Sequence, residues 1–299
     1  MTAAGAEQRA VIALIEPLVV QCRASWRRSL GGMAREVGVP EAALLFLFST
    51  ANVIDGGAVT VAVQREKAPY STKEPWRARW AELVAGGLAE PLADGWRITS
   101  SGQAALERLM RSSWRHFASL TLPAEELART RRDLEEVISR IGPDTPRMRW
   151  TRRLAARGEA ANADGVRLEH AILLLLMHRI DAHVSAWRAA GYAGPELDVL
   201  TQAWSGLRTI EEIERALATK QDPEDVRQHL ARLAERGDLT LDGPAVGITA
   251  GGKERRDAIE AETDRVGLAP WPEGEPLRRL GRDLEVLTRS VPAGAPQAA

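Results

Sequence analysis

The sequence predicts a mainly α-helical fold with small β-hairpins, in which one unit of about 150 residues occurs twice. The first observation is an ungapped repeat, because Ile98-Thr99-Ser100-Ser101-Gly102 recurs 150 positions later as Ile248-Thr249-Ala250-Gly251-Gly252. The same offset joins Gly87 to Gly237, Leu83 to Leu233, Glu74 to Glu224, and Arg132-Asp133-Leu134-Glu135 to Arg282-Asp283-Leu284-Glu285. The second observation is the order of helical and hairpin patterns, which is the same in both halves. We therefore expect two halves built from equivalent elements.

Composition limits the class of protein. With 299 residues, of which 44% are hydrophobic and 27% charged, the chain can form two ordinary cores. The longest apolar run, 171–177, is too short to cross a bilayer, and the N-terminus lacks the pattern of a signal peptide, so we expect a cytoplasmic protein. Cys22 is the single cysteine, which excludes an internal disulfide and a cysteine-based metal site and favours a packing role.

Charge is nearly balanced in the whole chain and in each half. The net charge is −1, with 20 Lys and Arg against 17 Asp and Glu in residues 1–150, and 20 against 24 in residues 151–299. Neither half has the strong positive charge of a committed nucleic-acid binder. Any contact with DNA must therefore come from a local patch.

In the first half, apolar residues at three- and four-residue spacing predict a helix over 7–30, ended by Gly31-Gly32. Pro40 begins a second, buried helix. Residues 58–66 alternate like a strand, but their equivalents in the second half have a helical pattern, so we predict a helix. Ser71-Thr72-Lys73-Glu74 resembles a capping box and predicts a helix over 74–86.

Downstream, a β-hairpin is expected around Ala93-Asp94-Gly95, followed by helices over 101–119 and 124–141. The second half repeats this order with helices over 166–190, from Pro195, over 209–218 and 223–235, a hairpin turning at Asp242-Gly243, and helices over 251–266 and 276–289. The predicted domains are a first unit over 1–146, a linker over 147–165, a second unit over 166–290 and a loose tail over 291–299.

The order helix, helix, helix, hairpin, helix is that of a winged helix-turn-helix. Together with Leu230, Leu233, Gly237 and Leu239 in the pattern Leu-x-x-Leu-x-x-x-Gly-x-Leu, and with Ile-Thr-x-x-Gly after each hairpin, it resembles MarR-type winged-helix regulators. The wings depart from that family, because Asp94-Gly95 and Asp242-Gly243-Pro244 stand where basic tips are expected.

The second half resembles the actinobacterial SalK-like helix-turn-helix proteins more specifically. The residues that carry this resemblance are His178-Arg-Ile-Asp181-Ala-His183, Trp187, Gly251-Gly252-Lys253-Glu254-Arg255-Arg256 and Glu260-Ala-Glu-Thr263-Asp264.

The MarR resemblance also implies how the two halves are arranged. MarR-like chains pair through their terminal helices, so a duplicated chain resembles two fused subunits. We therefore expect a tandem winged helix-turn-helix with a pseudo-two-fold axis, acting as a pseudo-dimer in one chain. Pairing is expected through helices 7–30, 104–141, 166–190 and 254–289.

The helices at 74–86 and 223–235 are the candidate DNA-recognition helices. Spacing places Val226, Leu230 and Leu233 in the core, and their equivalents are Trp76, Trp80 and Leu83. The side chains left facing outward are Arg77, Arg79, Arg227, Gln228, His229 and Arg232, which suit phosphate and base contacts. The alternative is a solvated charged face, because acidic residues share both helices: Glu74, Glu82, Glu224, Asp225 and Glu235.

A ligand site is also predicted. Trp26 and Trp187 occupy matching positions on the first helix of each copy, so we expect them to meet and to line a site for a small aromatic or hydrophobic ligand. Arg23, His178 and His183 would supply polar contacts. The alternative is a dry, packed interface between the copies.

No metal, cofactor or catalytic residue is predicted. His170, His178 and His183 lie on one predicted helix, but their spacings of eight and five residues do not bring imidazoles together on one face. The motifs of the common enzyme classes are missing, which makes an enzyme less probable without excluding one. The main prediction is a MarR-like transcriptional regulator of double-stranded DNA. The alternative is a winged-helix scaffold that does not bind DNA and acts as a metabolite-binding protein, biosynthetic accessory protein or enzyme.

Overall fold

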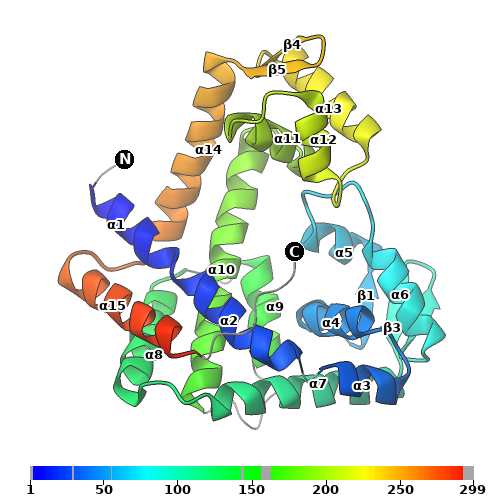
Figure 1. The fold of residues 1–299 in the computed structure, drawn as a ribbon, viewed down its shortest axis with the longest axis vertical. Helices are drawn as coiled ribbons and strands as arrows, with labels where there is room; N and C mark the ends of the chain where they lie inside the picture. Colours follow the sequence, from blue (N-terminus) through cyan, green and yellow to red (C-terminus); the bar gives the residue numbers. More distant parts are fainter. Residues whose placement is uncertain (1–2, 29, 55, 143–144, 156–162, 292–299) are drawn as a thin grey trace. The chain divides into compact units, whose positions relative to one another are not determined.

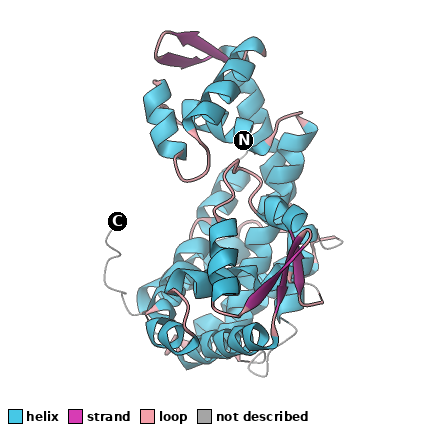
Figure 2. Ribbon diagram, turned by 90° about the vertical axis from the view of Figure 1, so that its right-hand side faces the viewer, coloured by secondary structure: helices cyan, strands magenta, loops and turns pink. Residues whose placement is uncertain are grey.

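A computed structural model of the chain describes residues 3–28, 30–54, 56–142, 145–155 and 163–291. Within these ranges the protein is mainly helical, as predicted, and the strands form two small sheets (Figures 1 and 2). The chain divides into two compact units. Unit 1 comprises Met1–Val59, Ala78–Arg179 and Gly267–Ala299, and unit 2 comprises Thr60–Arg77 and Ile180–Val266. Both units are discontinuous along the chain: residues 60–77 group with 180–266, and residues 267–299 group with unit 1.

Unit 1 begins with a series of short helices. These are α1 (Ala3–Ile12), α2 (Ile15–Arg27), α3 (Leu30–Val37), α4 (Glu41–Thr50) and the 3₁₀ helix η1 (Ala51–Val53). The prediction of one helix over 7–30 ended by glycines is wrong, because α1 and α2 are separate and Gly31-Gly32 lies inside α3. Each glycine costs a helix about 1 kcal/mol, and burial of Leu30 and Met33 at about 1.5–3 kcal/mol each offsets that cost.

The prediction for residues 58–66 is wrong in its first part. Strand β1 (Ala58–Thr60) comes first, and helix α5 (Val61–Lys67) follows it, with the Thr60 side chain accepting a hydrogen bond from Val63 N. In unit 1, β1 joins β2 (Ala89–Leu92) and β3 (Gly95–Ile98) in the order β1-β3-β2. Strands β2 and β3 are antiparallel and form the predicted hairpin.

Helix α6 (Trp76–Ala85) starts two residues later than predicted, and the expected capping box is not the one observed. Ser71 Oγ donates instead to the carbonyls of Lys73 and Lys220, at 2.7 and 2.8 Å. Glu74 accepts hydrogen bonds from Arg65 and Arg77. A long-range partner, Lys220, has replaced the local one that the sequence pattern indicates.

Four of the remaining helices of unit 1 agree with prediction at most positions: α7 (Ser100–Ser119), α8 (Ala124–Ser139), the first part of α10 (Asp164–Ala189) and α15 (Glu275–Ser290). A further helix, α9 (Pro146–Ala155), was not predicted. Helix α9 occupies much of the stretch predicted as a linker over 147–165. Residues 156–162 of that stretch, and residues 292–299 of the predicted tail, lie outside the described residues.

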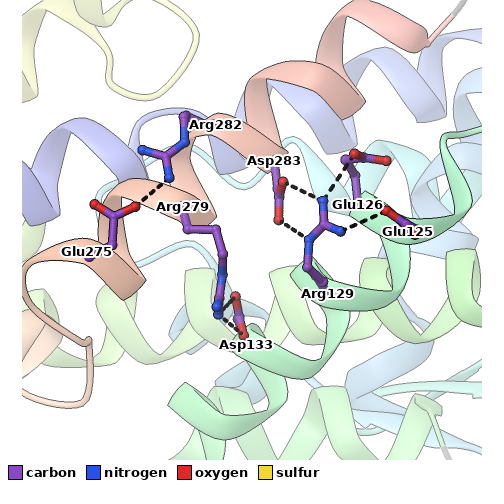
Figure 3. A network of polar contacts seen from close by, with 8 residues as sticks. All are labelled: Glu125, Glu126, Arg129, Asp133, Glu275, Arg279, Arg282 and Asp283. Carbon is purple, nitrogen blue, oxygen red and sulfur yellow. Dashed lines mark hydrogen bonds and ion pairs between the residues drawn. The ribbon is translucent and has the colours of Figure 1, made fainter.

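Helices α8 and α15 pack side by side in unit 1 (Figure 1) and are joined by two ion pairs (Figure 3). Arg129 donates to both carboxylate oxygens of Asp283 at 3.0 and 3.1 Å, and Arg279 donates to both of Asp133 at 3.0 and 2.9 Å. Each arginine and each aspartate lies 150 residues from its counterpart. The two contacts are therefore exchanged, as in an isologous interface where residue i meets j and j meets i.

Unit 2 contains the end of α10, from Ile180, and most of the second half. Its other elements are α11 (Gly194–Trp204), α12 (Ile210–Leu217), α13 (Pro223–Glu235), β4 (Leu239–Asp242), β5 (Ala245–Ile248) and α14 (Ala250–Leu268). The helices predicted over 209–218, 223–235 and 251–266 agree with α12, α13 and α14 to within two residues at each end, and α11 begins one residue before the predicted Pro195. A core of buried side chains from α10 to α14 holds them, including Trp187, Leu200, Ile213, Leu230 and Ile259.

The entry from each hairpin into the following helix has the same hydrogen bonds in both units. Thr99 Oγ1 donates to Gly87 O at 2.7 Å, and Thr249 Oγ1 donates to Gly237 O at 2.8 Å. The two threonine hydroxyls also accept from the amides of Gly102 and Gly252, at 3.0 and 2.9 Å. The Ile-Thr-x-x-Gly pattern thus marks a helix N-cap, which the sequence showed only as a repeat.

Candidate nucleic-acid interface

The candidate interface lies on the helix-turn-helix formed by α12 and α13. Helix α12 begins with a capping box in which Thr209 and Glu212 bond each other's backbone amides. Helix α13 begins at Pro223, whose missing amide hydrogen costs nothing at this position. As predicted, Val226, Leu230 and Leu233 are buried, which fixes the opposite face of α13 toward solvent.

The outward face of α13 carries Arg227, Gln228 and Arg232, all exposed. Arg227 is paired with Glu214 of α12 at 2.8 Å, and Gln228 Nε2 lies 3.4 Å from Glu224 Oε1. Among the described residues, Arg232 takes part in no ion pair. Two hydrogen-bonding side chains four residues apart, Gln228 and Arg232, are therefore available on one face of the helix.

The prediction that His229 faces outward is wrong, because the residue is 7% exposed. Its Nδ1 lies 3.0 Å from Gln221 Oε1, which is itself buried. Burial lowers the pKa of His229, and the nearby charge of Arg232 lowers it further. The imidazole is therefore a neutral part of the core of the motif and carries no charge toward phosphate.

The β-hairpins present acidic tips, in line with the sequence. Asp242 is the last residue of β4, directly before the Gly243-Pro244 turn, and the β2–β3 turn contains Asp94. On the first hairpin Arg97 is paired with Glu90 at 3.0 Å. Neither turn offers the basic side chain that a wing would place against a phosphate backbone.

Helix α6 presents fewer polar groups than α13. Trp80 and Leu83 are fully buried, and Trp76 is 6% exposed, so the predicted core positions are confirmed. Arg77 is bonded to Glu74 and lies over the Trp76 ring at 4.8 Å, while Arg79 pairs with Glu82 at 2.8 Å. Both predicted DNA-binding arginines of this helix thus have acidic partners on or beside it.

A loop in front of α6, residues 71–73, is bonded to the turn between α12 and α13 in unit 2. The amides of Thr72 and Lys73 donate to Lys220 O at 3.0 and 2.9 Å. Thr72 Oγ1 donates to Asp225 Oδ2 at 2.6 Å, and Lys73 pairs with Asp222 at 3.0 Å. This cluster was missed at the sequence level, because its members are about 150 residues apart.

A second group missed from the sequence surrounds Asp238, which is fully buried at the start of the β4–β5 hairpin. Tyr192 OH donates to its Oδ2 at 3.0 Å, and Arg255 Nε donates to Oδ1. Burial, followed by the charge of Asp238, raises the pKa of Tyr192, so its hydroxyl stays protonated and can donate. Arg236 lies over the Tyr192 ring at 3.9 Å and donates to Ala190 O at the end of α10. The group ties the hairpin to α10.

The structure places three residues of the predicted ligand site in unit 1. Trp26 packs against Phe48 with ring centroids 4.6 Å apart, and its indole nitrogen donates to Ser112 Oγ at 3.2 Å. Arg23 donates twice to Glu169, which is 3% exposed. His178, a third residue of the predicted site, is buried at 7% exposure.

The other two residues of that predicted site lie in unit 2. Trp187 donates its indole hydrogen to Tyr70 OH at 3.2 Å, and His183 Nδ1 lies 3.0 Å from Thr263 Oγ1. Thr263 Oγ1 donates to Ile259 O, so the imidazole is the donor toward Thr263. Trp26 and Trp187 are thus packed by neighbours in their own units.

Unit 2 has an open pocket of about 740 Å³ beside Trp187. The indoles of Trp76 and Trp187 contribute to its wall, together with the cationic side chains of Arg65, Lys73 and Arg188. All three cations are paired: Arg65 with Glu74 and Arg188 with Glu66, each at 2.7 Å, and Lys73 with Asp222 at 3.0 Å. Trp76 and Trp187 are only 6% and 4% exposed, so the pocket offers little aromatic surface together with both signs of charge.

Two further observations concern chemistry elsewhere in the described ranges. Burial raises the pKa of the Cys22 thiol to about 12, so it is a protonated packing group. No three His, Cys, Asp or Glu side chains of the described residues are grouped as a metal site. No helix in the described part of the chain is both long and apolar enough to cross a membrane.

Comparison with known proteins supports the assignment of the motif. Residues 155–296 match the model of a family described as a helix-turn-helix family. This range includes α12, α13 and the β4–β5 hairpin. No match was found among proteins with curated descriptions or among solved structures. The fold and the family match together define a helix-turn-helix domain in the second half of the chain.

Proposed function

We propose that the protein is a transcriptional regulator that binds double-stranded DNA through the outward face of α13. The observation that carries this proposal is the exposure of Arg227, Gln228 and Arg232 on the second helix of a helix-turn-helix. In such motifs the second helix enters the major groove, where arginine and glutamine side chains suit hydrogen bonds to base edges and phosphates. With a net charge of −1, the local face must provide the attraction.

We also propose that the chain is MarR-like, with two fused winged-helix copies around a pseudo-two-fold axis. The hydrogen bonds of Thr99 and Thr249, each repeated at the same offset, support duplication. The exchanged pairs Arg129–Asp283 and Arg279–Asp133 support a two-fold contact between terminal helices. A fused pair of this kind would need no second chain to form its interface.

The test of DNA binding is the salt-dependent affinity of the wild-type protein for labelled genomic duplexes. Replacing both Arg227 and Arg232 by alanine should weaken binding by about tenfold or more and lower the salt slope by about two, since each lost phosphate contact lowers it by about one. Arg265→Ala is the matched control, because Arg265 is 70% exposed and lies on α14.

Two outcomes would contradict this proposal. Unchanged affinity in the double variant would exclude α13 from the interface. A wild-type protein that binds no duplex even at low salt would favour the alternative, a winged-helix scaffold without DNA binding.

The pocket beside Trp187 supports a second candidate function, the binding of a small planar ligand. The predicted site joined Trp26 to Trp187, whereas this pocket uses Trp187 and Trp76 with nearby cations. An aromatic carboxylate bound there would contact the small exposed part of Trp187 and would pair with Arg188 in competition with Glu66. Titration with planar aromatic carboxylates should then quench tryptophan emission, and Arg188→Ala should weaken binding several-fold. Arg215→Ala, at 72% exposure on α12, should leave the titration unchanged. A flat wild-type titration would contradict this function.

A further inference from the structure

The two candidate recognition helices differ at the positions that face outward. Position 78 of α6 is equivalent to position 228 of α13, and Ala78 stands where α13 has Gln228. Likewise Glu82 stands where α13 has Arg232. Both Ala78 and Gln228 are exposed, so the difference lies on the surface. An alanine cannot hydrogen-bond a base edge, and a glutamate repels phosphate.

The outward face of α6 is further depleted by alanines and internal ion pairs. Ala81 and Ala85 are exposed on the same face as Ala78. The two cations of α6 are both paired: Arg79 donates to both oxygens of Glu82 at 2.8 and 2.9 Å, and Arg77, the equivalent of Arg227, donates to Glu74. Base contacts by α6 would therefore require breaking a local ion pair, whereas Arg232 of α13 is available.

The loop 71–73 is bonded to the start of α13 within unit 2. Thr72 Oγ1 donates to Asp225 in the first turn of α13, and Lys73 pairs with Asp222, the residue before that helix. Trp76 and Arg77, the first residues of α6, belong to unit 2, whereas the rest of α6 belongs to unit 1. The loop in front of α6 therefore stabilises the helix-turn-helix of α12 and α13.

From these observations we infer that α13 alone recognises base sequence, and that the preferred DNA is a single half-site without an inverted repeat. This inference rests on the proposed DNA binding and adds the kind of site that is bound. Helix α6 retains the buried positions of the motif, because Trp80 and Leu83 are buried. Its loop holds the α12–α13 turn through the carbonyls of Ala218 and Lys220. The first copy thus supports the second as a structural element.

The test is selection of duplexes from a random pool by the full-length protein, followed by sequencing. One short motif, present once per duplex, is the expected result. Enrichment of inverted repeats with half-site centres about 10 base pairs apart would overturn the inference while leaving DNA binding intact. Failure to enrich or retain any duplex would contradict the proposed function itself and this inference with it.

Matched variants on the two helices give an independent measurement. Gln228→Ala should lower affinity for the selected duplex by roughly ten- to hundredfold and relax the preference at one base pair. Arg79→Ala should change the affinities for selected and scrambled duplexes alike, by no more than about threefold, as expected of a surface charge. Both side chains lie on helix surfaces, so unchanged thermal melting should confirm folding. A larger loss of sequence preference in Arg79→Ala than in Gln228→Ala would overturn the inference.

Discussion

Gly252→Ala is expected to destabilise unit 2 by about 3 kcal/mol or more, at the upper end of the cost of overpacking. A Cβ atom at this position would lie 2.0 Å from the carbonyl oxygen of Asp238, where ordinary contacts begin near 3.4 Å. The carbonyl cannot move freely, because it accepts the amide of Thr249 at 3.0 Å. Insertion of one methyl group therefore separates α14 from the β4–β5 hairpin.

The adjacent glycine is a matched control for this prediction. A Cβ at Gly251 would meet only the flexible end of Arg255, at 3.4 Å or more, and alanine favours a helix by about 1 kcal/mol over glycine. Urea denaturation followed by circular dichroism should show Gly251→Ala to be neutral or slightly stabilising. Equal stability of the two variants would contradict the close approach. Gly102→Ala should behave like Gly252→Ala in unit 1, because its Cβ would lie 1.9 Å from Leu88 O.

Trp80→Ala should cost about 3–5 kcal/mol of unfolding free energy in unit 1, the range for removal of a buried aromatic side chain. Trp80 is fully buried, stacks on Trp96 at 5.1 Å with an interplanar angle of 7°, and meets the edge of Phe46 at 5.5 Å. Truncation leaves a cavity beside the rings of Trp96 and Phe46. Denaturation midpoints measure the loss, and near-ultraviolet circular dichroism reports the broken indole pair.

Trp80→Phe separates ring packing from the polar group. In the wild-type protein the indole nitrogen of Trp80 is buried and has no acceptor among the described residues. Phenylalanine therefore removes an unsatisfied donor while keeping most of the ring contact. We expect a cost of about 1 kcal/mol, well below that of alanine. A phenylalanine variant as unstable as the alanine variant would show that the indole itself, and not aromatic packing, stabilises the site.

Local patterns accounted for most of the secondary structure. The helix at 223–235 has Pro223 at its start and buried residues at three- and four-residue spacing, and its observed bounds are Pro223–Glu235. The β4–β5 hairpin follows from Asp242-Gly243, since Gly243 has φ +55°. In both cases the stabilising interactions join residues near in sequence, so the sequence pattern is informative.

The predictions that were wrong concern residues whose conformation depends on a partner distant in sequence. Ser71 fits a local capping box, yet it bonds Lys220, which no local pattern can indicate. By residue type His229 suits a phosphate contact, but its imidazole is hydrogen-bonded to the Gln221 side chain in the core. Asp238 lies 150 residues after the apolar Leu88, and its carboxylate is tolerated in the interior because Arg255 and Tyr192 bond it.

The sequence predicted which face of α13 points outward, but it did not predict the difference between α6 and α13. Spacing alone identified the outward residues Arg227, Gln228 and Arg232. The acidic partners of Arg77 and Arg79 were visible in the sequence as Glu74 and Glu82, but only geometry shows that they are engaged. The rule that follows is that an arginine followed or preceded by an acid three residues away should be treated as paired until shown otherwise.

The exchanged contacts between α8 and α15 differ from those of a homodimer in their dependence on protein concentration and in their response to mutation. In a homodimer, such a contact weakens as the protein is diluted, and one substitution alters both sides at once. Here Arg129, Asp133, Arg279 and Asp283 belong to a single polypeptide, so their encounter is intramolecular and independent of protein concentration. Asp283→Asn alters one of the two contacts and leaves the other intact. The residues of one ion pair can therefore change while those of the other ion pair stay the same.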